Sequence, residues 1–146
     1  MRIFILLMFG WCSLSWASLF AADSETEMKK FDGTWTLSSG EAEGKALPEM
    51  QLKGGTLVIK DGHYTVTMPE KEKLTGMQKV DPSKTPKTIE ITDDSGANKG
   101  KTCLGIYEFK GEEFHCVFAP FGKDRPAKFS TAPDSGQWLH VWKKTK

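Results

Sequence analysis

The chain has 146 residues, 38% of them hydrophobic, and its 20 lysines and arginines are nearly balanced by 19 aspartates and glutamates. A nucleic-acid-binding protein normally shows a basic excess or a basic stripe, so this balance argues against nucleic acid as a partner. The length is sufficient for one domain with a hydrophobic core.

The first 22 residues have the pattern of a secretory signal peptide. Arg2 precedes a long apolar run, and acidic, polar sequence begins at Asp23. We therefore predict a signal peptide at 1–22 and an exported protein, either periplasmic or extracellular. The alternative is an uncleaved anchor, because 3–22 is long enough to cross a bilayer. Cleavage removes Arg2 and no acidic residue, which leaves 19 basic and 19 acidic residues, and no segment of the mature chain is expected to span a membrane.

The mature sequence predicts a short flexible leader at 23–30 followed by one domain at 31–146. Asp61-Gly62 separates two alternating runs, Thr56–Lys60 and His63–Met68, which is a strong signal for a β-hairpin. Because strand side chains alternate between faces, pairing Lys60 with His63 sorts both runs together. The face assigned to the interior then contains Leu57, Ile59, Tyr64, Val66 and Met68.

The rest of the chain predicts further short strands separated by turns. Strands are expected at 74–80 and 87–92, on either side of a proline-containing loop, and again at 127–131 and 137–144. Eight or nine short strands without a convincing long helix are typical of a sandwich or an up-and-down barrel. We predict an all-β, single antiparallel up-and-down barrel, because closure removes the open edges that sequential hairpins leave.

A central hairpin spans 102–119, with Lys110-Gly111 as its expected turn and Phe109 opposite Glu112. One face is almost wholly apolar and is assigned to the interior, whereas the other is mixed and includes an outward apolar strip of Leu104, Ile106 and Val117. The interior face contains Cys103, Gly105, Tyr107, Phe109, Phe114, Cys116 and Phe118. Its two cysteines lie diagonally across the ladder, so two buried thiols are favoured over a disulfide, although an oxidising compartment permits one.

Two sets of residues are similar to known proteins. Gly33-Thr34-Trp35 resembles the Gly-x-Trp start of lipocalin-type barrels, in which a basic side chain near the end of the last strands packs over the tryptophan; the resemblance gives that role to Lys143, or alternatively to Lys144. A longer set of segments resembles a family of exported lipocalin-like domains, numerous in planctomycete bacteria, without an assigned biochemical function. These segments are GKALP (44–48), VDPSKTPKTIEI (80–91), GKTCLGIYEF (100–109), CVFAPFGKDRPAKF (116–129) and SGQWLHVWKK (135–144). The resemblance implies a lipocalin-like barrel and export, and it supplies no catalytic residues.

The residue types that often carry catalysis or bind metals are scattered. His63, His115 and His140 lie on three separate strands and lack the paired spacing of a helical metal site. His115 and Cys116 are strand neighbours, so their side chains point to opposite faces and cannot act as base and nucleophile. The glycine-rich run at 96–102 precedes a strand, whereas a phosphate-binding loop precedes a helix. We therefore predict a non-catalytic protein without a metal or cofactor.

Two non-catalytic functions remain as hypotheses. In the first, the interior binds a small apolar or amphipathic ligand, and its lining would be Leu57, Ile59, Tyr64, Tyr107, Phe109, Phe114 and Phe118. In the second, the barrel is filled and acts as a structural or interaction scaffold that binds an envelope or extracellular protein. The contact surface would be the outward apolar strip or a loop containing Phe121, Lys123 and Arg125. Analogy of fold favours the first hypothesis slightly.

Overall fold

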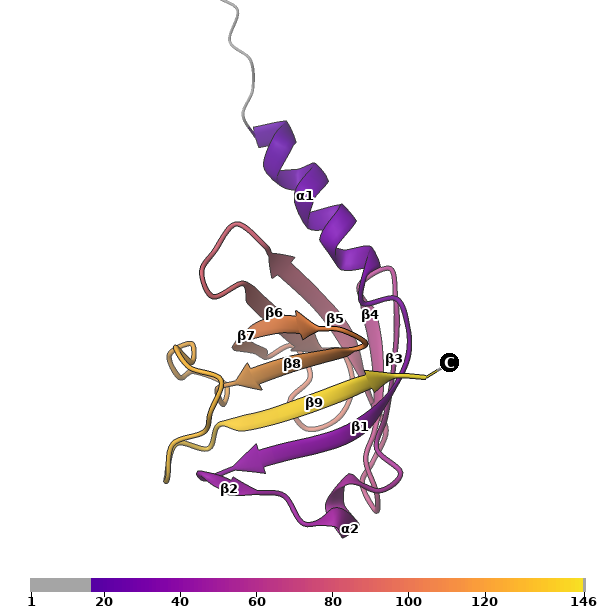
Figure 1. Cartoon of the computed structure of the whole chain (residues 1–146), viewed down its shortest axis with the longest axis vertical. Helices are drawn as coiled ribbons and strands as arrows, with labels where there is room; N and C mark the ends of the chain where they lie inside the picture. The colour runs from indigo at the N-terminus through magenta and orange to yellow at the C-terminus, as the bar shows by residue number, and fades with distance from the viewer. Residues whose placement is uncertain (1–16, 146) are drawn as a thin grey trace, which may run out of the picture.

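The computed structural model describes residues 17–145. Most of the predicted signal peptide, 1–16, lies outside the described residues. The described chain forms one antiparallel sheet in the order β2-β1-β3-β4-β5-β6-β7-β8-β9, in which β1 also pairs with β9. This last pairing closes eight strands into an up-and-down barrel and leaves β2 as an extra strand beside β1 (Figure 1). The predicted all-β antiparallel barrel is confirmed.

The barrel strands follow one another around the wall in chain order. They are β1 Gly33–Ala42, β3 Thr56–Lys60, β4 His63–Thr67, β5 Leu74–Asp81, β6 Thr88–Asp93, β7 Thr102–Lys110, β8 Glu113–Phe118 and β9 Trp138–Lys144; the remaining elements are β2 Lys45–Ala46, α1 Ala17–Lys29 and α2 Glu49–Leu52. The predicted strand at 127–131 is absent, because this segment is a loop whose Thr131 donates its backbone N–H and its hydroxyl to Glu41. Neither helix in the described range is long and apolar enough to cross a membrane.

The structure confirms the predicted register of one hairpin and corrects that of the other. Lys60 pairs with His63, as predicted. In the central hairpin Phe109 pairs with Phe114, so the predicted register is wrong by two residues. The turn is Gly111-Glu112, and Gly111 takes the positive φ of 62° at its first position. A shift of two residues keeps every side chain on its face, and the predicted interior face is therefore correct.

Aromatic rings fill the end of the barrel where the chain enters it. Phe31 is 0% exposed, and its ring centre lies 4.8 Å from that of Phe109, 5.1 Å from Tyr107 and 5.3 Å from Phe114. The indole N–H of Trp35 donates to the backbone oxygen of Phe31 over 2.7 Å. Edge-to-face ring contacts of this kind add to the stabilisation from buried apolar area. These contacts place Phe31, which precedes the first strand, inside the barrel.

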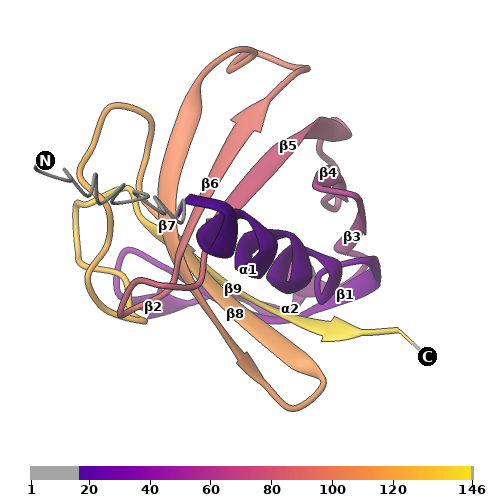
Figure 2. The same cartoon turned by 90° about the horizontal axis from the view of Figure 1, so that it is seen from above.

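Helix α1 replaces most of the predicted flexible leader. The prediction of flexibility at 23–30 is wrong, because residues 23–29 are helical and the side chain of Glu27 is buried. Figure 2 shows α1 at one end of the barrel, with its C-terminal turn against the strands. The reason is tertiary, since the last turn of α1 contacts groups that are distant in sequence, such as Lys87 and Tyr107.

The outer wall of the barrel is covered on one side by the long segment between β8 and β9. Ile106 is 1% exposed and Val117 is 0% exposed, although both point away from the interior. The backbone N–H of Ala119 donates to Leu104, and Arg125 donates to carbonyls on β6 and β7. The predicted outward apolar strip is therefore not an exposed surface, because the chain folds back over it.

Candidate functional site

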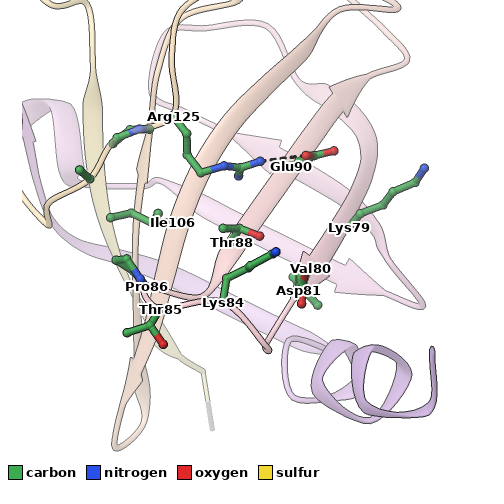
Figure 3. Close-up of a pocket in the computed structure, with 12 residues that line it drawn as sticks. Lys79, Val80, Asp81, Lys84, Thr85, Pro86, Thr88, Glu90, Ile106 and Arg125 are labelled. Carbon is green, nitrogen blue, oxygen red and sulfur yellow. Dashed lines mark hydrogen bonds and ion pairs between the residues drawn. The ribbon is translucent and has the colours of Figure 1, made fainter. Parts of the chain in front are cut away.

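A groove of about 640 Å³ lies on the outside of the barrel, over β5, β6 and β7 (Figure 3). One wall is the loop 82–87 between β5 and β6, and the other is the segment 125–127 that crosses the outer wall. We call this hollow the outer groove and define it by Lys79, Lys84, Pro86, Glu90, Ile106 and Arg125. Its floor and walls are partly apolar, because Ile106, Pro86 and Pro126 all line it.

Arg125 holds one wall of the outer groove in place. Its guanidinium donates to the backbone oxygens of Ile89 (3.0 Å) and Gly105 (2.6 Å) and to a carboxylate oxygen of Glu90 (2.9 Å). Figure 3 shows this side chain reaching toward Glu90 on β6. The sequence assigned Arg125 to a partner-binding loop, but three of its donors are already used within the chain. Arg125 therefore fixes the wall formed by the segment 125–127, and Glu90 offsets its positive charge.

Two lysines give the outer groove a positive excess. Lys79 and Lys84 are exposed, and neither has an ion-pair partner among residues 17–145. Of the two carboxylates beside them, Glu90 is paired with Arg125. Asp81 accepts hydrogen bonds from the hydroxyl and backbone N–H of Ser83, which lower the pKa of its carboxyl, and the nearby charge of Lys84 lowers it further. The lining thus holds three cations, Lys79, Lys84 and Arg125, against two carboxylates, and neither lysine ammonium is in a direct ion pair within the described residues.

A second hollow, of about 460 Å³, lies on the other side of the same loop. It is lined by Lys30, Lys84, Lys87, Glu108, Phe109 and Phe129, and we call it the rim pocket. Lys84 and Pro86 line both hollows, so the loop 82–87 is the partition between them. Phe129 comes from the long β8–β9 segment, which therefore contributes to both hollows.

The other two residues of the predicted interaction loop lie beyond the outer groove. Phe121 is 56% exposed, and the ammonium group of Lys101 lies 4.9 Å from the centre of its ring. Lys123 is exposed as well. The loop thus presents one large aromatic side chain to solvent, and aromatic residues are enriched at protein contact sites.

The seven residues predicted to line an interior ligand site all belong to the barrel core or pack against it. Two of them, Tyr64 and Tyr107, carry the hydroxyls through which an interior site would orient an amphipathic ligand. Instead, the hydroxyl of Tyr64 donates to Asp93, and that of Tyr107 donates to Glu27 over 3.1 Å. Burial, together with these carboxylates, raises the pKa of both phenols. The groups expected to bind a ligand are therefore engaged by the protein itself.

Close packing around the interior glycines also indicates that the barrel interior is filled by the protein's own side chains. Gly105 pairs with Phe118 across the β7–β8 ladder. A side chain at Gly105 would come within 2.5 Å of the ring of Phe118, so only glycine leaves room for that ring. Gly76 lies opposite Tyr64 in the same way. These two pairs fit aromatic rings against bare backbone, as in a packed core.

Lys144, and not Lys143, packs over the tryptophan of the Gly-x-Trp motif. Its ammonium nitrogen lies 5.1 Å from the ring centre of Trp35, and the two residues are directly paired between β1 and β9. Lys143 is exposed on the other face of the strand, so the assignment of Lys143 is wrong and the alternative holds. Glycine at position 33 leaves room for the Lys144 side chain, because a side chain at this position would come within 3.1 Å of it.

Burial shifts the pKa values of His140 and Cys116, which are paired across the β8–β9 ladder. Burial lowers the pKa of His140 to about 4, with a further contribution from the charge of Lys71, and its ring meets that of Trp142 edge-on. Burial also raises the pKa of Cys116 to about 12, so its thiol is a poor nucleophile at neutral pH. Cys103 and Cys116 are both free thiols. Within residues 17–145, no histidines, cysteines and acidic residues gather as a metal site would require.

No family model, curated protein or solved structure matches this chain. Membership of a family of exported lipocalin-like domains therefore stays a prediction.

The outer groove was missed by sequence reasoning because its walls come from segments about 40 residues apart. The one local signal was that both segments are bracketed by prolines, at 82 and 86 and at 120 and 126.

Proposed function

We propose that this protein is an exported, non-catalytic binding module in which a filled barrel serves as a rigid scaffold. The partner is an anionic segment of another envelope or extracellular protein, and it binds in the outer groove. The observation that carries this proposal is the pair of unpaired lysines, Lys79 and Lys84, beside an apolar floor in the same hollow. The lysines would meet carboxylates of the partner, and the floor would meet an apolar side chain.

The rigidity of the outer groove supports this function. Arg125 ties one wall to the backbone of β6 and β7, and the strands beneath belong to a closed barrel. A preformed site loses less conformational entropy when it binds, so a short segment gains usable affinity there. Phe121, exposed beyond the groove, offers an additional aromatic contact to a longer partner.

The packing of the interior favours this proposal over a ligand within the barrel. The residues predicted for an interior site contact one another and Phe31, and the two tyrosine hydroxyls have protein partners. An interior ligand stays a prediction, and it would need several of these side chains to move.

Binding of a defined acidic peptide tests the proposal. The probe is a fluorescent peptide that alternates glutamate and leucine, titrated with the mature protein in a fluorescence anisotropy assay. We expect the double variant Lys79→Gln/Lys84→Gln to bind about tenfold more weakly, which corresponds to roughly 1.4 kcal/mol. The matched control is Lys53→Gln/Lys99→Gln, which removes two exposed lysines outside the groove. Equal loss in both double variants would mean that net charge alone drives binding and would contradict the proposal.

A further inference from the structure

The end of α1 is built into the barrel. Phe31 occupies the centre of the aromatic cluster, and Met28 lies between the barrel strands and their turns, where its sulfur accepts a hydrogen bond from the side-chain amide of Gln78 over 3.2 Å. The same sulfur lies beside Gly62 in the β3–β4 turn. We call the segment 27–31 the inner plug, because it closes this end of the barrel from within.

Glu27 is the polar anchor of the inner plug. It is 5% exposed, and its carboxylate is paired with Lys30 and with Lys87, the latter at 2.7 Å. The hydroxyl of Tyr107, inside the barrel, donates to the same carboxylate. A buried charge is tolerated only when it is paired and hydrogen-bonded, and here three donors surround it. Burial raises the pKa of Glu27, but the two lysines and the tyrosine outweigh this effect, so the pKa lies below its ordinary value.

The residues just ahead of Glu27 make no ion pair or side-chain hydrogen bond of this kind with the described part of the chain, residues 17–145. Asp23, Glu25 and Thr26 are exposed and Ser24 is half-buried, although all four belong to α1. A boundary between a dispensable stem and an essential plug therefore falls between Thr26 and Glu27. Loss of residues 23–26 removes little buried surface, whereas loss of Glu27 leaves Tyr107 and Lys87 without their carboxylate.

From this geometry we infer a limit for N-terminal processing: the exporting peptidase cuts ahead of Glu27, and the inner plug remains in the mature protein. Cleavage before Asp23, the site that the sequence predicts, satisfies this limit and keeps a short helical stem. Cleavage after Glu27 would open the end of the barrel. It would also release Lys30 and Lys87, which line the rim pocket, from their shared carboxylate.

The intact mass of the full chain after export from a bacterial host tests the limit directly. We expect a cleaved chain whose new N-terminus is Glu27 or an earlier residue. A dominant species that begins at Met28 or later, and still unfolds cooperatively, would overturn the inference. Because the mass also reports an uncut chain, failure of the predicted signal peptide is distinguished from failure of the limit.

Thermal unfolding of two matched variants tests the reason for the limit. Glu27→Gln and Glu25→Gln remove the same charge from the same helix, one inside the barrel end and one in solvent. We expect Glu27→Gln to lower the Tm by at least about 4 °C and Glu25→Gln to change it by less than about 1 °C. If Glu27→Gln cannot be produced as folded protein, Glu27→Asp replaces it in the experiment. This variant keeps the charge, so we expect a smaller decrease in Tm. Equal Tm values for the variants at 25 and 27 would overturn the inference.

Discussion

The ammonium group of Lys144 lies 5.1 Å from the ring centre of Trp35, across the seam between β9 and β1 that closes the barrel. The last strand thus contacts the first strand through a cation and an aromatic face as well as through backbone hydrogen bonds. At this seam the first and last strands of the barrel pair. The stability of the seam therefore reports on closure of the barrel.

Replacement of Lys144 by glutamine should destabilise the protein, because it removes a cation–π contact beside the buried Trp35. We expect a loss of about 0.5–2 kcal/mol in the free energy of unfolding, measured by urea denaturation. Lys143→Gln is the matched control, since Lys143 is exposed on the opposite face, and it should change stability by less than about 0.5 kcal/mol. The reverse order of the two effects would mean that Lys143 contacts Trp35.

Replacement of Phe31 by alanine should leave a cavity among Tyr107, Phe109 and Phe114. We expect a loss of about 3–5 kcal/mol, as for other fully buried phenylalanines. The same substitution at the exposed Phe121 should cost less than about 0.5 kcal/mol. Chemical denaturation of both variants measures the difference. Similar losses would show that the inner plug does not occupy the barrel in solution.

Replacement of Arg125 by alanine should release the segment that covers the outer wall. Two backbone carbonyls and Glu90 lose their donor, so we expect a loss of about 1–3 kcal/mol. Cleavage within 119–137 by a dilute protease should become faster, because this segment is then held less firmly. Lys123→Ala, in the same segment but exposed, is the control and should leave both measurements unchanged. An unaltered cleavage rate in Arg125→Ala would contradict the positioning role.

The free energy of unfolding should fall as the pH is lowered from about 6.5 to about 4. In the folded protein His140 has a pKa of about 4, whereas its ordinary value is 6.5. Between these values the unfolded chain binds the proton and the folded chain does not, so acid favours unfolding. His140→Gln should flatten this part of the profile, measured by urea denaturation at several pH values. The exposed His63 serves as the control, and an equal effect of His63→Gln would contradict the assignment.

The β-hairpins were predictable where local signals decide the structure. Asp61-Gly62 lies between two alternating runs, and this pattern specifies both the turn and the register of Lys60 with His63. At Gly111 the sequence allows two turns, Lys110-Gly111 and Gly111-Glu112, which differ by two residues in register. Both place Tyr107 and Phe114 on the same face, so the interior was predicted correctly from an incorrect pairing.

The candidate site was less predictable because it depends on contacts between distant segments. Arg125 reaches the backbone at Ile89 and Gly105, and no local pattern encodes that contact. The same segment covers Ile106 and Val117, which strand alternation alone places on an outer surface. Likewise, the residues ahead of Phe31 are polar, and this composition predicts a flexible leader. In the folded barrel, however, the carboxylate of Glu27 accepts hydrogen bonds from Lys30, Lys87 and the hydroxyl of Tyr107. Buried polar pairs of this kind have no signature in the sequence.

An NMR titration of the ¹⁵N-labelled mature protein tests the central claim most directly, since it locates a bound partner on the barrel. The probe is the peptide that alternates glutamate and leucine, and the same peptide with lysine in place of glutamate is the control. We predict that the acidic peptide shifts the backbone amides of Lys79, Lys84 and Ile106, in the outer groove, and that the basic peptide does not. Shifts centred on Ile59, Tyr64 and Phe118 would instead place the ligand inside the barrel and contradict the account.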